Sequence, residues 1–137
     1  MRALTRYLAA SDVPAYVRVG RGAVPGIYDE GVSAFTPGKA NRLRTGRDAS
    51  IIACGEMVHP ALLAEDLLLK DGISVSVYDF CSIKPLDTDA ILEAAENGLV
   101  VTAEEHSVHG GLGGAVAEVL AQHKPTRQLL LGLPDEA

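Results

Sequence analysis

The pattern of apolar and polar positions changes its period along the chain, and these changes mark the expected helices and strands. In residues 2–11 the apolar side chains recur at helical spacing, which predicts a helix that ends before Pro14. Residues 15–19 alternate as a strand would, and the glycines and prolines of residues 20–38 predict a linker. Because these pieces do not make a domain, we interpret residues 1–38 as the end of a preceding one.

From residue 39 onward, strand and helix patterns alternate regularly. The expected strands cover residues 40–45, 49–54, 73–80, 99–102 and 127–131, and the expected helices cover residues 57–70, 88–96 and 113–123. Either Asp87 or Thr88 caps the second of these helices. This alternation is typical of an α/β domain whose parallel sheet is covered on both faces. Since the chain stops just after the last strand, without a covering helix, we expect a truncated end.

Composition narrows the function classes. The chain has 137 residues, 47% of them hydrophobic but only 4% aromatic, so Ala, Val, Leu and Ile must build the core. A net charge of −6 argues against binding to nucleic acid. No signal peptide or membrane-spanning run stands out, and Cys54 and Cys81 lie in expected strands as buried thiols would. We therefore expect a soluble, cytoplasmic protein with no membrane partner.

The first candidate chemistry lies in an acidic turn that follows the strand expected at residues 99–102. Glu104 and Glu105 could tune His106 for proton transfer. Alternatively, one glutamate pairs with a neighbour and His106 hydrogen-bonds across an interface. A zinc site usually needs three or four convergent ligands at recognisable spacings, so His106 and His109 do not predict a metal site.

Three further features could contact an anion. The N–H groups of the turn that includes Gly110, Gly111 and Gly113 open a helix and could hold an anion, although such glycines also permit close packing. Lys84 could contact a phosphate or carboxylate, while its motif also makes sense as a turn before a capped helix. Arg21, with a second arginine three residues earlier, could clamp a phosphate or simply carry surface charge.

Taken together, the motifs resemble the carboxyl-terminal part of transketolase, within the superfamily of thiamine diphosphate enzymes. The segments that carry this resemblance are residues 15–21, 38–40, 83–87, 104–106 and 110–113. The histidine after the acidic pair is more similar to transketolase than to its relatives. The ordered set is specific, although each segment alone is weak.

The resemblance implies a fold and two parts. Residues 39–137 are expected to form a three-layer αβα domain, with a mostly parallel five-stranded sheet and one antiparallel edge strand. Residues 1–38 are expected to be the end of a pyrimidine-binding domain and its linker. Arg21 matches the arginine that binds the phosphate of the sugar substrate in transketolases. Lys84, His106 and the glycine turn remain candidates for an interface or an anion contact.

The resemblance also implies a division of labour. The parent enzyme would transfer a two-carbon ketol unit between sugar phosphates of the pentose phosphate pathway, using thiamine diphosphate and Mg²⁺. The cofactor motif and the catalytic residues of the other domains are absent here. This chain is therefore expected to bind no cofactor, to be inactive alone, and to pack against the remaining domains or a partner subunit in a homodimer.

Two alternatives stay open at this point. The chain could be an autonomous module that binds an anion or nucleotide at the glycine turn. It could also be the same domain of a deoxyxylulose phosphate synthase or of a 2-oxoacid dehydrogenase β chain.

Overall fold

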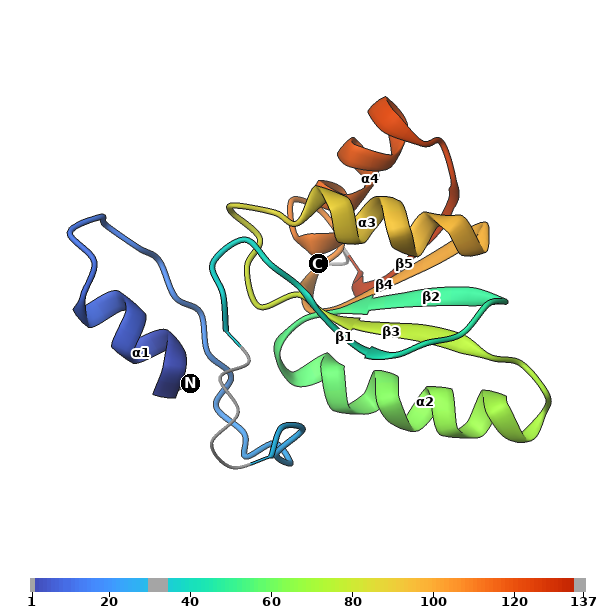
Figure 1. Ribbon diagram of the computed structural model, residues 1–137, viewed down its shortest axis with the longest axis horizontal. Coiled ribbons are helices and arrows are strands. Elements are labelled where there is room, and N and C mark those ends of the chain that lie inside the picture. Colours follow the sequence, from blue (N-terminus) through green and yellow to red (C-terminus); the bar gives the residue numbers. More distant parts are fainter. Residues whose placement is uncertain (1, 30–34, 135–137) are drawn as a thin grey trace.

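The computed structural model describes residues 2–29 and 35–134, which form one sheet with helices on both faces and an N-terminal segment beside it (Figure 1). The elements, in chain order, are α1 (Arg2–Ala9), β1 (Asn41–Arg44), β2 (Ala49–Ala53), η1 (Gly55–Met57, a 3-10 helix), α2 (Val58–Lys70), β3 (Val75–Asp79), α3 (Thr88–Ala94), η2 (Ala95–Asn97, 3-10), β4 (Leu99–Ser107), α4 (Leu112–His123) and β5 (Arg127–Leu133).

The sheet has the strand order β1-β3-β2-β4-β5. Strand β1 runs antiparallel to β3, and every other neighbouring pair is parallel. Helix α2 lies on one face, and α3 and α4 lie on the other (Figure 1). The predicted three-layer αβα fold, with its single antiparallel edge strand, is confirmed.

Because successive strand residues point to opposite faces, the sheet separates two hydrophobic cores. On the side of α3 and α4, Ile52, Phe80 and Ile91 are almost fully buried together with Leu112 and Val116. The α2 side is built from smaller side chains, mostly alanine and valine. As the composition predicted, aliphatic residues fill most of both cores.

Helix α3 is attached to the first edge strand through Asp87. Of the two predicted caps, Asp87 is the one used, and its Oδ1 accepts a hydrogen bond from the Ala90 N–H at 3.3 Å. Its Oδ2 accepts from the Ala40 N–H at 2.9 Å, just before β1. Lys39 forms ion pairs with both Asp87 and Asp89 at 3.3 Å. Two motifs 47 residues apart are thus joined by one buried carboxylate.

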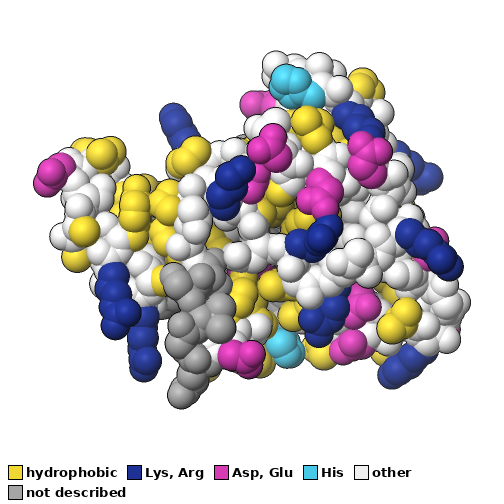
Figure 2. Space-filling model, in the orientation of Figure 1, with side chains coloured by type: hydrophobic (Ala, Val, Ile, Leu, Met, Phe, Trp, Pro, Cys, Tyr) yellow, Lys and Arg dark blue, Asp and Glu magenta, His cyan; other side chains and the backbone are white. Residues whose placement is uncertain are grey.

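The strand expected over residues 15–19 is not formed. A strand needs a neighbour to pair with, and within the described residues no strand of the sheet pairs with this segment. Helix α1 is present as predicted but buries none of its residues. Its Tyr7 ring packs against Phe35, with ring centroids 5.7 Å apart. Figure 2 shows hydrophobic side chains gathered over this N-terminal part of the molecule.

Strand β4 is longer than predicted, because the acidic segment belongs to the strand and not to a turn. Residues 99–103 pair with β5 in regular register, and after an irregularity Ser107 pairs with Leu133. The Val108 N–H also donates to the Leu133 carbonyl at 3.2 Å. This second contact extends the strand through Glu104, Glu105 and His106, despite their polar side chains.

Two further expectations need correction. Strand β5 is not covered on both faces, since Leu131 and Leu133 are 54% and 58% exposed. Helix α2 packs mainly on β3, and Met57 of η1 lies near the carboxyl end of β5. The cysteines lie just past strand ends and not inside strands: Cys54 is half-buried, and Cys81 is exposed.

Candidate functional site

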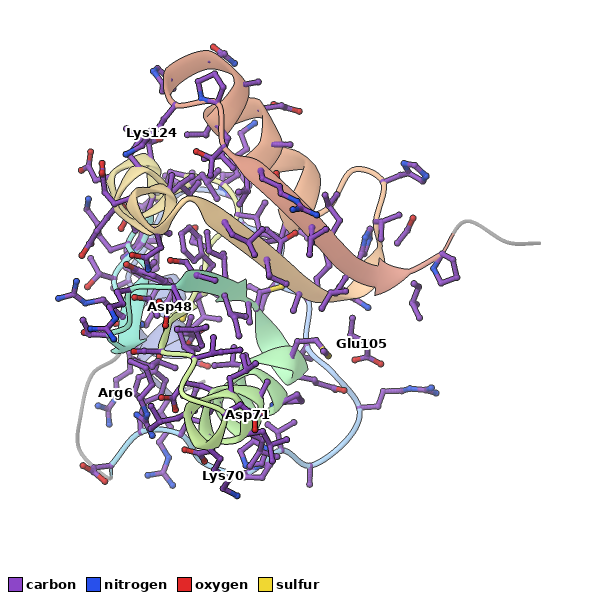
Figure 3. All side chains as sticks on the ribbon, turned by 90° about the vertical axis from the view of Figure 1, so that its right-hand side faces the viewer. Arg6, Asp48, Lys70, Asp71, Glu105 and Lys124 are labelled. Atoms are coloured by element: carbon purple, nitrogen blue, oxygen red, sulfur yellow. The ribbon has the colours of Figure 1, made fainter. Side chains whose placement is uncertain are left out.

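The carboxyl ends of the central strands meet at one edge of the sheet, and residues 18–22 lie over this edge. Together they form a pocket of about 340 Å³, the arginine pocket. It is lined by Arg18, Val19, Gly20, Arg21, Gly22, Glu56 and Glu105. Figure 3 shows Glu105 beyond the end of the sheet. This edge is where open α/β sheets usually bind ligands, which makes the pocket the candidate site.

The pocket combines two exposed arginines with two carboxyl groups. Glu56 comes from η1, directly after β2, and Glu105 comes from the end of β4. The two carboxyl groups line the same pocket, and hydrogen bonding to Glu105, followed by partial burial and the charge of Glu105, raises the pKa of Glu56. The Gly22 N–H and the charge of Arg18 oppose that rise. Glu56 therefore links the N-terminal segment to the sheet.

We expect the contact between Glu56 and Glu105 to weaken as the pH rises. Because the pKa of Glu56 is raised in the folded chain, the folded state holds the proton more tightly than the unfolded chain, whose glutamates titrate near pH ~4.3. The stabilisation is complete below that pH and is lost as the pH rises through the raised pKa. The free energy of unfolding, measured against pH, should lose this dependence in Glu56→Gln and keep it in the control Glu118→Gln. An unchanged profile in Glu56→Gln would contradict the assignment.

Glu104 plays a different part from its neighbour. Its buried carboxylate accepts hydrogen bonds from the Leu112 N–H at 2.7 Å and the Gly113 N–H at 2.8 Å. These are the first free N–H groups of α4, where the helix dipole favours a negative charge. The glycine turn thus already holds an anionic group from its own chain, and an external anion would have to displace it.

The glycines of this turn allow the Glu104 carboxylate to come close to the backbone. Gly110 has a φ of +74°, a conformation that L side chains rarely adopt. A Cβ on Gly111 would collide with the Glu104 carboxylate, and one on Gly113 would lie 2.9 Å from Leu130 Cδ2. The glycine turn therefore does both things that the sequence allowed. It packs closely, and the anion that it binds is the Glu104 carboxylate of the same chain.

The other predicted site residues do not line the arginine pocket. His106 is partly buried, and its Nδ1 lies 2.9 Å from the Ser107 carbonyl oxygen. Lys84 is exposed, and a cis peptide bond joins it to Pro85. Within residues 2–29 and 35–134, no three His, Cys, Asp or Glu side chains are placed to hold a metal ion.

A second contact at the same sheet edge was not foreseen from the sequence. The Tyr28 hydroxyl donates to Asp79 Oδ2 at 2.5 Å, and the Cys81 thiol donates to the same oxygen at 3.3 Å. Although Cys81 as a whole is exposed, desolvation of its thiol, followed by the Asp79 carboxylate, raises its pKa to about 12. Burial likewise comes first in raising the pKa of Cys54 to about 11, so neither thiol is activated as a nucleophile. The only sequence signal was an aromatic residue inside an otherwise Gly- and Pro-rich linker.

The described part of the chain has no helix with the length and apolar character needed to cross a bilayer.

Comparisons with known proteins show which family this fold belongs to. Residues 38–137 match the family model described as transketolase, C-terminal domain. Over 136 residues the chain is 46% identical to one subunit of the apulose-4-phosphate transketolase of Phocaeicola vulgatus, covering 98% of this chain and 43% of that protein. It is also 38% identical over 139 residues to 1-deoxy-D-xylulose-5-phosphate synthase of Magnetococcus marinus, covering 98% of this chain and 22% of that protein.

A solved structure described as a split gene transketolase, inactive beta4 tetramer, superposes with a TM-score of 0.93 at 42% identity. The match covers 98% of this chain and 45% of that one. The chain therefore spans less than half the length of these relatives.

Proposed function

This chain belongs to the family of transketolase C-terminal domains, and from that premise we propose that it is the non-catalytic C-terminal portion of a transketolase. The assembled enzyme would transfer a two-carbon ketol unit between sugar phosphates. The observation that carries the proposal is the match to a transketolase subunit along 98% of this chain. Ketol transfer catalysed by this chain alone would contradict it.

In this proposal Arg21 contacts the phosphate of the sugar substrate. Its guanidinium is exposed in the arginine pocket, at the edge of the sheet where the N-terminal segment crosses. A guanidinium offers a fork of donors that matches two phosphate oxygens. Arg18 adds a second positive charge to the same pocket. In this proposal thiamine diphosphate and Mg²⁺ bind to the part of the enzyme that carries the cofactor motif, which this sequence lacks.

The test compares acceptors with and without a phosphate in the complete enzyme, meaning this chain together with the part that carries the cofactor. Replacing Arg21 by Gln removes a charge-assisted contact worth about 1.5–3 kcal/mol, so KM for a phosphorylated aldehyde should rise roughly 10- to 100-fold. KM for glycolaldehyde should stay within about twofold. The matched control is Arg6→Gln, in α1. Equal losses for both acceptors would remove Arg21 from the phosphate site.

The match to deoxyxylulose phosphate synthase supports a second candidate for the reaction of the complete enzyme, the synthesis of deoxyxylulose phosphate. Both activities would use the same C-terminal domain, so this chain alone does not separate them. Assaying the complete enzyme with pentose phosphates, and in parallel with pyruvate plus glyceraldehyde phosphate, distinguishes the two. The proposal predicts turnover with the pentose phosphates.

We also propose that copies of this chain associate with each other or with partner subunits. Val17, Val19 and Ile83 are 38%, 58% and 43% exposed, and β5 adds the exposed side chains of Leu131 and Leu133. Large exposed apolar surfaces usually mark contact sites. The split-gene relative is described as a tetramer of its β chain.

Sedimentation of the isolated chain should therefore give a mass that increases with concentration. Leu131→Lys should reduce this association if β5 forms the contact, and Val19→Lys should reduce it if the N-terminal segment does. A monomer at high concentration would overturn the proposal.

A further inference from the structure

We propose that Tyr28 and Asp79 are positioning residues for Arg21. Their contact fixes one end of residues 18–28, the arginine strap, and the strap carries Arg21. The inference rests on the proposed role of Arg21 and adds how the C-terminal domain controls it. It is carried by two contacts that attach the strap to the same edge of the sheet.

The first attachment is at Glu56. Its carboxyl lines the same pocket as Arg21 and Gly22, and the Gly22 N–H acts on it to lower its pKa. The same carboxyl lies so close to Gly20 that a Cβ there would collide with it. The chain on either side of Arg21 is therefore in contact with one side chain of η1, and glycine at position 20 is what permits this approach.

The second attachment is at Tyr28 and Asp79. Ile27 packs against the core on the α2 side, and the Tyr28 hydroxyl donates to Asp79 Oδ2 at 2.5 Å. Asp79 is only 5% exposed and is the last residue of β3, paired in register with Ala53. Because it belongs to the sheet, its carboxylate is a rigid acceptor. Burial, followed by the hydrogen bond to Asp79, raises the pKa of Tyr28, so the hydroxyl stays protonated as the donor.

Between the two attachments the strap has little support of its own. Residues 23–26 are exposed, and a Cβ added to Gly22 or Gly26 would meet no atom within 4 Å. Releasing Tyr28 would leave the strap attached through Glu56, whose contact is partly exposed and pH-sensitive, and through the packing of Ile27. A forked guanidinium binds phosphate well only when its plane is correctly oriented. Loss of the Tyr28 contact should therefore weaken phosphate recognition without removing any phosphate-binding group.

The experiment uses Tyr28→Phe in the complete enzyme, with Tyr7→Phe as the matched control. Both variants remove one hydroxyl and keep the ring, and Tyr7 retains its packing against Phe35. We expect Tyr28→Phe to raise KM for a phosphorylated acceptor about tenfold, with kcat and KM for glycolaldehyde nearly unchanged. Asp79→Ala, which removes the acceptor oxygens, should reproduce the effect. In the double variant with Arg21→Gln, Tyr28→Phe should add nothing further, because both changes act through Arg21.

A second measurement needs only this chain. Trypsin should cleave after Arg21 about ten times faster in Tyr28→Phe than in the wild type, and at the wild-type rate in Tyr7→Phe. If Arg21→Gln affects phosphorylated acceptors but Tyr28→Phe behaves like Tyr7→Phe in both measurements, the inference is wrong and the proposed function stands. If Arg21→Gln has no phosphate-specific effect, the proposed function fails, and the inference fails with it.

Discussion

Replacing Glu104 by Ala should destabilise the fold by about 3–4 kcal/mol, the largest effect that we expect from a single polar substitution in this chain. The carboxylate is 4% exposed and accepts two backbone N–H groups at the start of α4. Removing it leaves both buried donors without an acceptor and opens a cavity against Gly111. It also removes the negative charge that the helix dipole favours.

Two comparisons isolate the cause in urea unfolding. Glu104→Gln keeps the shape and one acceptor oxygen, so its cost should be about 1–2 kcal/mol. Glu118→Gln changes an exposed glutamate in the same helix and should stay within about 0.5 kcal/mol of the wild type. If Glu104→Ala lost no more than Glu118→Gln, the carboxylate would not be the cap of α4.

The second large effect is expected at Asp87, where Ala should cost about 2–3 kcal/mol. This substitution removes the cap of α3 and the acceptor for the Ala40 N–H together, so it separates β1 from the helix that follows the turn. Asp89→Ala is the matched control, because Asp89 also pairs with Lys39 but its side chain is 89% exposed. Its cost should remain below about 0.5 kcal/mol. Thermal unfolding of the two variants measures the difference, and equal transition temperatures would contradict it.

Asp87 should also make stability depend on pH in the acid range. Burial alone would raise the pKa of Asp87, but hydrogen bonds from the Ala40 and Ala90 N–H groups and from Lys39 outweigh it and lower that pKa. The stabilisation is therefore present above the pKa of an unfolded aspartate, near ~3.9, and is lost as the pH falls through the lowered value. The difference in unfolding free energy between the wild type and Asp87→Ala should shrink below pH ~4.

Much of the fold could be predicted because most helices and strands have a recognisable pattern of apolar residues within their own segment. The β-branched run before Gly55 and the alternation of apolar helix and strand segments placed the central elements within a few residues. The alternation of residues 40–45 predicted an edge strand, and only its antiparallel direction came from the family resemblance, since the pattern of Asn41–Arg44 does not fix a direction.

The site was harder to predict because its decisive contacts join residues distant in the sequence. Glu104 and the helix it caps are eight and nine residues apart, so its role depends on how β4 leads into α4. Tyr28 and Asp79 are 51 residues apart, and neither belongs to a sequence motif from which their contact could be predicted. The strand expected at residues 15–19 failed for a related reason: its alternation is a preference that only a neighbouring strand can satisfy.

The two edges of the sheet differ in a way that limits how large an assembly can grow through them. Strand β1 presents Arg42 and Arg44, engaged by Glu93 and Glu65, whereas β5 presents a row of leucines. Charged edges resist pairing with other strands, and bare apolar edges invite it. Among the described residues, a contact through β5 can therefore close on itself as a symmetric pair, and the ion-paired edge at β1 does not match it for a third copy to continue. Association through β5 therefore stops at a closed pair, and we expect it to give discrete complexes and not filaments.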